Sequence, residues 1–331
     1  MFIPGKPILA CYANNEQLFI KHIKKMTAKK NMDNISRTDA YFHFYIKHPE
    51  IRWTFLASMV SRNAGWNMCD LEGNCFQKLI GKNLRDMLFF TYERANWLIF
   101  QDAYPQLLLY HYSTKMNKPM FHLLKKFNVS SFMEQEWLHF WRAGNEKRLM
   151  ISLIINEQNV IQQPVMEHPV YKNKVFHTMI FAFQDYFHFS SVIFPTCNGE
   201  LYGTSVNGFR SVSKRIDLGK RLAEILFDQR FYNAIFKFAS NTAHTGSRHD
   251  YEQYFKKKAP RTTPFLRCTY PIITHHIHQF HDWSANKRIK KKWQIEGISQ
   301  RHPVHITKWY LHKQKQLEIA AAWLGNLFHS N

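Results

Sequence analysis

Residues 35–73, ISRTDAYFHFYIKHPEIRWTFLASMVSRNAGWNMCDLEG, predict two consecutive helices separated at Pro49. Ser36 and Asp39 have the spacing of a capping box, so the first helix is expected to begin there and to carry the aromatic run that ends before the proline. Pro49 suits the first turn of the second helix, where a missing N–H costs no hydrogen bond. The expected buried stripe of the second helix is Ile51, Phe55, Leu56, Met59 and Val60.

The same helical period recurs along the rest of the chain. Ser131 and Glu134 repeat the capping-box spacing, and apolar residues recur at helical spacing from Ile306 to Phe328. The exception is the glycine-rich stretch 196–213, where Asn207-Gly208 has the signature of a two-residue hairpin turn. We therefore expect a mainly α protein, with a compact, bundle-like body of several helices, one glycine-rich central loop or hairpin, and a long C-terminal helix packed on the core.

The composition fits one large or two medium-sized globular domains. The 331 residues are 45% hydrophobic and 16% aromatic with only 21% charged, which argues against intrinsic disorder and a coiled coil. Five cysteines without a Cys-x-x-Cys pair indicate neither a disulfide framework nor a four-thiolate zinc site, and they fit a reducing cytoplasm.

The sequence gives no sign of a signal peptide or a membrane span. The N-terminal apolar stretch is short and broken by proline. The most apolar window, 175–195, contains His177, Gln184, Asp185 and His188, and a bilayer does not accept so many polar groups without partners. We expect a core helix in this window.

The formal net charge of +21 is concentrated at the C-terminal end of the chain. Residues 253–331 hold 14 cations and three anions, whereas residues 39–252 hold 24 cations and 19 anions. We expect three parts: a basic N-terminal helical arm (1–34), a helical core body (35–252) that divides into two halves near 196–213, and a basic, His- and Lys-rich helical section (253–331) packed on the core.

The C-terminal basic run combines the two features of sequence-tolerant nucleic-acid binding, which are phosphate-neutralising cations and an aromatic face for stacking. The candidate nucleic-acid-binding residues are Lys287, Arg288, Lys290, Lys291, Lys292 and Trp293. Two alternatives stay open: a solvated surface that serves solubility alone, and contact with anionic lipid head groups.

A second candidate is an anion site at residues 244–250. Ser247 and Asp250 have capping-box spacing, and free N–H groups at a helix start beside an arginine suit a phosphate or carboxylate. The candidate anion-binding residues are His244, Thr245, Ser247, Arg248 and His249. The alternative is an ordinary capped helix whose Arg and His side chains face solvent.

A third candidate is a divalent metal site in the segment 270–282. If this segment is helical, His275, His278 and Asp282 fall on one face, and two imidazoles with a carboxylate are adequate ligands for zinc, manganese or iron. No His-Glu-x-x-His motif accompanies them, so a plain polar face is the alternative. Together with His249-Asp250, the segment invites comparison with HD-type phosphohydrolases.

A fourth candidate is a polar pocket built from two Arg- and Asn-containing segments. Its candidate residues are Arg62, Asn63, Glu93, Arg94, Asn96 and Asp102. Glu93 is expected to pair with Arg62 across a helix contact. The alternative is a buried network that only fixes packing, because structural ion pairs resemble functional clusters.

Four segments together resemble the YppC-like family, a domain of unknown function found in Bacillus-type bacteria. They are residues 35–73, quoted above, 92–111 (YERANWLIFQDAYPQLLLYH), 244–252 (HTGSRHDYE) and 263–272 (TPFLRCTYPI). The resemblance covers the chain from about Ile35 to His281. It implies a bacterial cytoplasmic protein and carries over no activity, substrate or catalytic residue.

The charge distribution favours a non-enzymatic binder of nucleic acid or another polyanion that acts through the basic C-terminal section. The alternative is a hydrolase-like enzyme acting on a phosphorylated or otherwise anionic substrate, with a divalent metal as its cofactor. A scaffold for another protein is a third hypothesis. The sequence leaves the oligomeric state and the choice between DNA and RNA open.

Overall fold

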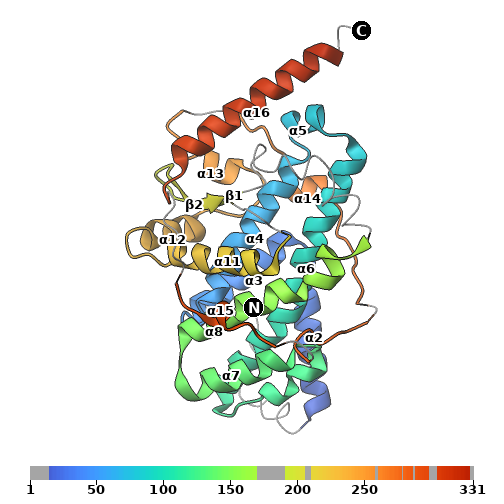
Figure 1. Cartoon of the computed structure of the whole chain (residues 1–331), viewed down its shortest axis with the longest axis vertical. Coiled ribbons are helices and arrows are strands. Elements are labelled where there is room, and N and C mark those ends of the chain that lie inside the picture. Colours follow the sequence, from blue (N-terminus) through green and yellow to red (C-terminus); the bar gives the residue numbers. More distant parts are fainter. Residues whose placement is uncertain are drawn as a thin grey trace.

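A computed structural model describes residues 15–169, 191–205, 210–257, 260–277, 279–285, 288–297 and 304–328, with side chains up to residue 323. It confirms the mainly α fold class (Figure 1). The shorter helices are α5 (Asn74–Leu79), η1 (Phe121–Phe127), η2 (Gln162–Met166), α12 (Tyr232–Asn241), α13 (His249–Glu252) and α14 (Leu266–Thr269).

Two antiparallel helices, α3 (Asn34–Lys47) and α4 (Trp53–Asp70), form the centre of the body. The predicted start at Ser36 is wrong by two residues, because the Asp33 carboxylate accepts the Ser36 N–H (2.7 Å) and caps the helix. The predicted start of the second helix at Pro49 is also wrong. Residues 49–52 form a turn instead, in which the Ile51 N–H donates to the His48 carbonyl.

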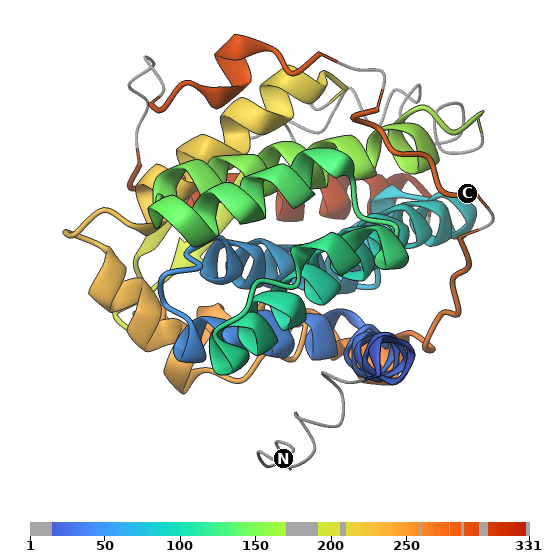
Figure 2. The same ribbon diagram turned by 90° about the horizontal axis from the view of Figure 1, so that it is seen from below.

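The other long helices surround this pair. Helix α6 (Lys82–Met116) packs on α3, α4 and α8 (Glu146–Val160), while α2 (Glu16–Lys30) lies against α6. Figure 2 shows α7 (Ser131–Ala143) and α8 on one side of α4 and α6, with α3 on the other. The core is aromatic: for example, Tyr41 packs edge-on against Trp53 with ring centroids 5.4 Å apart. Helix α7 is capped by Ser130, one residue before the predicted cap Ser131, because Ser130 Oγ accepts the Met133 N–H.

A two-stranded hairpin interrupts the helices, as expected of the central glycine-rich stretch. Strands β1 (Ser191–Pro195) and β2 (Leu201–Ser205) pair antiparallel, and the chain turns at Gly199, whose φ of +78° lies in the left-handed region that favours glycine. The expected turn at Asn207-Gly208 lies outside the described residues. Of the core helix expected over 175–195, residues 191–195 form β1 and the others lie outside the described residues.

The described residues of the C-terminal section are mostly without regular secondary structure before the predicted final helix, α16 (Thr307–Phe328). Just ahead of α16 the chain bonds to the edge of β2, because the Gly203 N–H donates to the Val304 carbonyl and the Ile306 N–H to the Leu201 carbonyl, both at 2.9 Å. The Tyr310 hydroxyl then lies 2.7 Å from the Tyr251 hydroxyl. The division into an arm, a body and a tail at residues 34 and 252 stays a prediction.

Among the residues described, no helix is both long enough and apolar enough to cross a bilayer.

Candidate functional site

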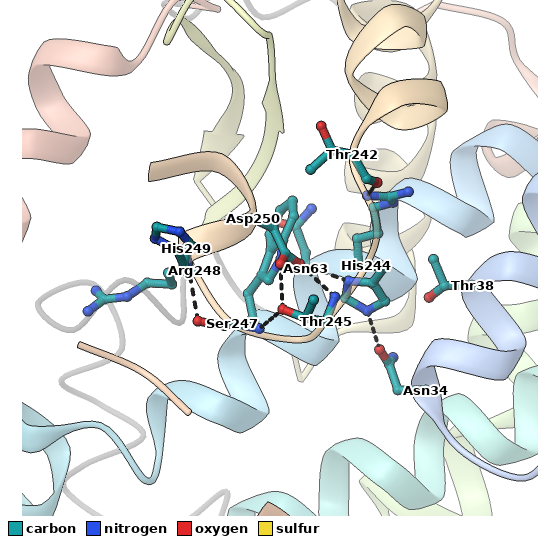
Figure 3. Close-up of polar contacts among 12 residues, drawn as sticks. Asn34, Thr38, Asn63, Thr242, His244, Thr245, Ser247, Arg248, His249 and Asp250 are labelled. Carbon is teal, nitrogen blue, oxygen red and sulfur yellow. Dashed lines mark hydrogen bonds and ion pairs between the residues drawn. The ribbon is translucent and has the colours of Figure 1, made fainter. Parts of the chain in front are cut away.

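The anion-site segment 244–250 is folded inward around a buried histidine (Figure 3). His244 Nε2 lies 2.7 Å from Asn34 Oδ1, and its Nδ1 lies 3.3 Å from Asp250 Oδ2. Burial lowers the pKa of His244, although the hydrogen bond to Asp250 opposes the shift. The Asn34 amide N–H groups donate to Ser61, which fixes Oδ1 as the atom that faces the histidine.

Asp250 gathers the surrounding donors. Its carboxylate accepts the Thr245 N–H (3.0 Å), the Thr245 hydroxyl (2.5 Å) and the indole N–H of Trp66 (3.0 Å). Burial alone would raise the pKa of Asp250, but these hydrogen bonds and the contact with His244 hold it below its usual value. The cluster is satisfied by protein groups, and it ties residues 244–250 to α3 and α4.

Helix α4 leaves room for this cluster at Gly65. A Cβ atom there would lie 2.7 Å from His244 Nε2 and even closer to Asn34 Oδ1. Only a glycine allows the histidine to approach the helix this closely.

The other residues of the segment do not form an open anion site. Ser247 Oγ bonds to Thr263, and Arg248 is 7% exposed, with its Nε 2.9 Å from Asp70 Oδ1. The alternative of a capped helix from Ser247 with Arg248 and His244 facing solvent is also wrong, because both side chains are buried and α13 is one turn that begins at His249. Burial raises the pKa of Asp70 to about 7, although the Arg248 guanidinium opposes the shift.

The predicted polar-pocket residues are divided among three places. Arg62 donates to the carbonyls of Ala239 and Thr242 at the end of α12. The Asn63 side chain donates to the carbonyl of Ile193 in β1 and accepts the N–H of the same residue. The expected Arg62–Glu93 pair is wrong, because Glu93 forms a buried ion pair with Arg37 of α3. Asn63 and Asn96 line a central cavity of about 210 Å³.

Arg94 and Asp102 line a separate groove of about 960 Å³ between α6, η2 and the segment 274–283. Arg94 donates to the carbonyl of His276 (3.0 Å). Burial raises the pKa of Asp102 to about 7, even though Asn156 and Gln106 donate to its Oδ2. This carboxyl group therefore holds its proton close to neutral pH.

The groove also contains two of the three predicted metal ligands, but not in the expected arrangement. The helix predicted over 270–282 is wrong, since the described residues of the segment form no helix, and His278 lies outside the described residues. Asp282 accepts the Ser131 N–H at the start of α7 (2.9 Å), while His275 Nε2 lies 3.8 Å from Glu93 Oε1. The described part of the chain holds no group of three or more side chains able to bind a metal ion.

The basic run is exposed except for its tryptophan. Arg288, Lys290, Lys291 and Lys292 face solvent, and Lys287 lies outside the described residues. Trp293 is 0% exposed and its indole N–H donates to Ser213 Oγ (2.9 Å), so the predicted stacking role of this ring is wrong. Burying this large apolar ring in the core stabilises the fold more than leaving it exposed to solvent.

Comparisons with known proteins agree with the YppC-like resemblance, which is confirmed. A family described as "Protein of unknown function (DUF2515)" matches residues 29–311. The "Uncharacterized protein YppC" of Bacillus subtilis (strain 168) is 47% identical over 309 residues, which cover 92% of this chain and 96% of that protein. No solved structure matches.

The close packing at Gly65 predicts that adding one methyl group there strongly destabilises the fold. We expect Gly65→Ala to lower the free energy of unfolding by about 2–3 kcal/mol, because either His244 or Asn34 must move. Urea denaturation followed by far-UV circular dichroism measures this loss. Gly81→Ala is the control, since a Cβ there meets nothing within 4 Å, and it should cost less than about 1 kcal/mol. Equal losses in the two variants would contradict the packing argument.

The protonated Asp102 predicts a pH-dependent contribution to stability. Its pKa is about 7 in the folded chain against a reference value of 3.8, so the contribution is complete below pH 4 and is lost as the pH rises through 7. Asp102→Asn keeps an acceptor for Gln106 and Asn156 and does not ionise. We expect the stability of this variant relative to the wild type to rise between pH 5 and pH 8 by roughly 1–3 kcal/mol.

Thermal melts of both proteins across this pH range test the expectation. Asp86→Asn on the same helix is the control, since that carboxylate pairs with Lys82 near the surface. A constant difference between Asp102→Asn and the wild type would show that Asp102 is ionised throughout the range.

Proposed function

We propose that this chain, which belongs to the DUF2515 family, binds the phosphate backbone of nucleic acid through a basic strip formed by Arg288, Lys290, Lys291 and Lys292. One observation carries the proposal: these four exposed cations have no ion pair with any described carboxylate. Unpaired, clustered cations are the usual electrostatic footprint of a polyanion-binding surface.

The strip is held in place from inside the body. Trp293 of α15 (Lys291–Gln294) is buried among α8 and α11 (Val212–Leu226), and it bonds to Ser213. Lys220 of α11 donates to the carbonyls of Lys292 (3.3 Å) and Ile295 (3.2 Å). Because the main chain is fixed by these contacts, binding a phosphate backbone orders only the side chains, which reduces its entropic cost.

With Trp293 buried, the strip offers charge and no stacking platform. Recognition then depends on phosphates, which every nucleic acid presents, so the proposal is for sequence-independent binding. Of the other three tryptophans of the section, the exposed Trp323 lies on α16, whose C-terminal end is far from α15 (Figure 1), and the other two are at least partly buried. Trp283 is partly buried, and its indole N–H donates to Asn156, while Trp309 is half-buried against the core.

The enzymatic alternative has less support in the described residues. The parts proposed for it are separated, with His244 against α3 and α4, Ser247 bonded to Thr263, and His275 and Asp282 in the groove beside α6. Groups that act together in catalysis must converge on one reacting atom. Scattered positions favour a binding protein over a hydrolase.

Neutralising the strip should weaken nucleic-acid binding. We expect Arg288, Lys290, Lys291 and Lys292 changed together to Gln to reduce affinity for a fluorescein-labelled 20-bp DNA duplex by at least tenfold at 50 mM salt. The slope of log K against log salt should fall in magnitude by about 3–4, since each phosphate contact contributes about 0.9. Fluorescence anisotropy titrations at several salt concentrations measure both quantities.

The control is a second basic surface of equal charge. Lys21, Lys24, Lys25 and Lys29 of α2 are exposed and lie on the opposite side of the body from α15 (Figure 2). Their replacement by Gln removes the same formal charge and should change the affinity by less than threefold. If both variants lose affinity equally, net charge alone drives binding, and if neither does, the proposed surface is wrong. Selective binding to phosphatidylserine vesicles and not to DNA would contradict the nucleic-acid assignment.

A further inference from the structure

We infer that the central cavity lined by α3, α4, α6, α8 and α11, with η2 and β1 at its edge, binds a small uncharged molecule with an apolar body and one hydrogen-bond-accepting oxygen. The cavity has a volume of about 210 Å³. Its wall is mainly apolar, with Leu56 and Val60 of α4, Ile99 of α6 and Leu222 of α11 among the side chains. Concave apolar sites with a few convergent polar groups are the usual form of small-molecule sites in proteins.

Two donors in the wall require an acceptor. The Tyr41 hydroxyl and the Arg37 Nε–H are buried, and neither has a hydrogen-bond partner among the described residues. The other nitrogens of Arg37 are engaged, one with Asn31 and one with Glu93. An unsatisfied buried donor costs about 1–3 kcal/mol, so a ligand oxygen that accepts from either group would recover part of this energy.

The charges around the cavity favour an uncharged molecule. The positive charge of Arg37 is matched by Glu93 in the buried ion pair. Glu157 also lines the cavity, and burial raises the pKa of its carboxyl to about 7. An anion would therefore meet a second carboxylate above pH 7, while a cation would meet the guanidinium of Arg37. Arg215, on the same wall, already donates to Gln158 and Gln162.

The volume limits the size of the molecule. An engineered cavity of about 150 Å³ holds one benzene ring. A cavity of about 210 Å³ therefore has room for a ring with one small polar substituent, such as an aromatic amide or ketone.

The probe for this inference is 4-fluorobenzamide, which supplies an aromatic ring and a carbonyl acceptor. We expect saturable binding to the full chain in a fluorine NMR titration, together with a rise in melting temperature. Fluorobenzene, which lacks the acceptor, should bind at least fivefold more weakly. No saturable binding of 4-fluorobenzamide, or equal binding of the two compounds, would overturn the inference and leave water as the occupant of the cavity.

Filling the cavity should remove the site. Ala95 of α6 and Ala64 of α4 line it from different helices, so Ala95→Leu and Ala64→Leu each reduce its volume from one wall. We expect each variant to abolish binding of the probe, and two independent positions protect the test against one variant that fails to fold. Ala28→Leu on the exposed side of α2 is the matched control and should bind like the wild type. Wild-type affinity in either cavity variant would overturn the inference.

Removing the Tyr41 hydroxyl tests the polar contact separately from the effect of cavity volume. Tyr41→Phe keeps the ring and deletes the unsatisfied hydroxyl, and it should weaken 4-fluorobenzamide binding about three- to tenfold. Its affinity for fluorobenzene should stay unchanged. Tyr45→Phe is the control one turn along α3, because it deletes a hydroxyl that bonds to Tyr232 away from the cavity. Equal effects of the two changes on the amide would contradict the proposed contact.

Discussion

The close contact between α3 and α4 is the constraint on which the rest of the body depends. Asn34, Thr38 and Ser61 link the two helices by buried hydrogen bonds, and Gly65 opens the space that His244 fills. The same contact therefore joins the N-terminal hairpin of helices to a segment 210 residues away. Buried polar groups of this kind specify a single arrangement, because any other packing leaves them without partners.

The sequence predicted local structure well and long-range pairing poorly. The helical period identified α4, α7 and α16, but it placed helix starts one to four residues away, because neighbouring polar residues such as Ser130 and Ser131 give the same local signal. The pairs Arg37–Glu93 and Trp293–Ser213 join residues 56 and 80 positions apart. Sequence spacing does not identify pairs this far apart. The predictions of an Arg62–Glu93 pair and of an exposed Trp293 were therefore both wrong.

The net charge of the sequence overstates the charge available at the surface. Arg37, Arg62, Arg215 and Arg248 are all at least 93% buried. Each guanidinium donates to carbonyls, amides or carboxylates inside the body, where its planar array of N–H groups can hold several elements at once. Arginine in this chain thus has two uses, internal cross-linking and surface charge, which composition cannot separate.

The bonding of residues 304–306 to the edge of β2 sets an order of events during synthesis. The hairpin of residues 191–205 is complete long before its outer edge is covered, because the covering residues follow about 100 positions later. On the ribosome that edge therefore carries N–H and C=O groups that are bonded only to water for as long as the intervening residues are being translated. During synthesis, the edge of β2 can therefore pair with a strand of another chain, whereas in the folded protein residues 304–306 cover it.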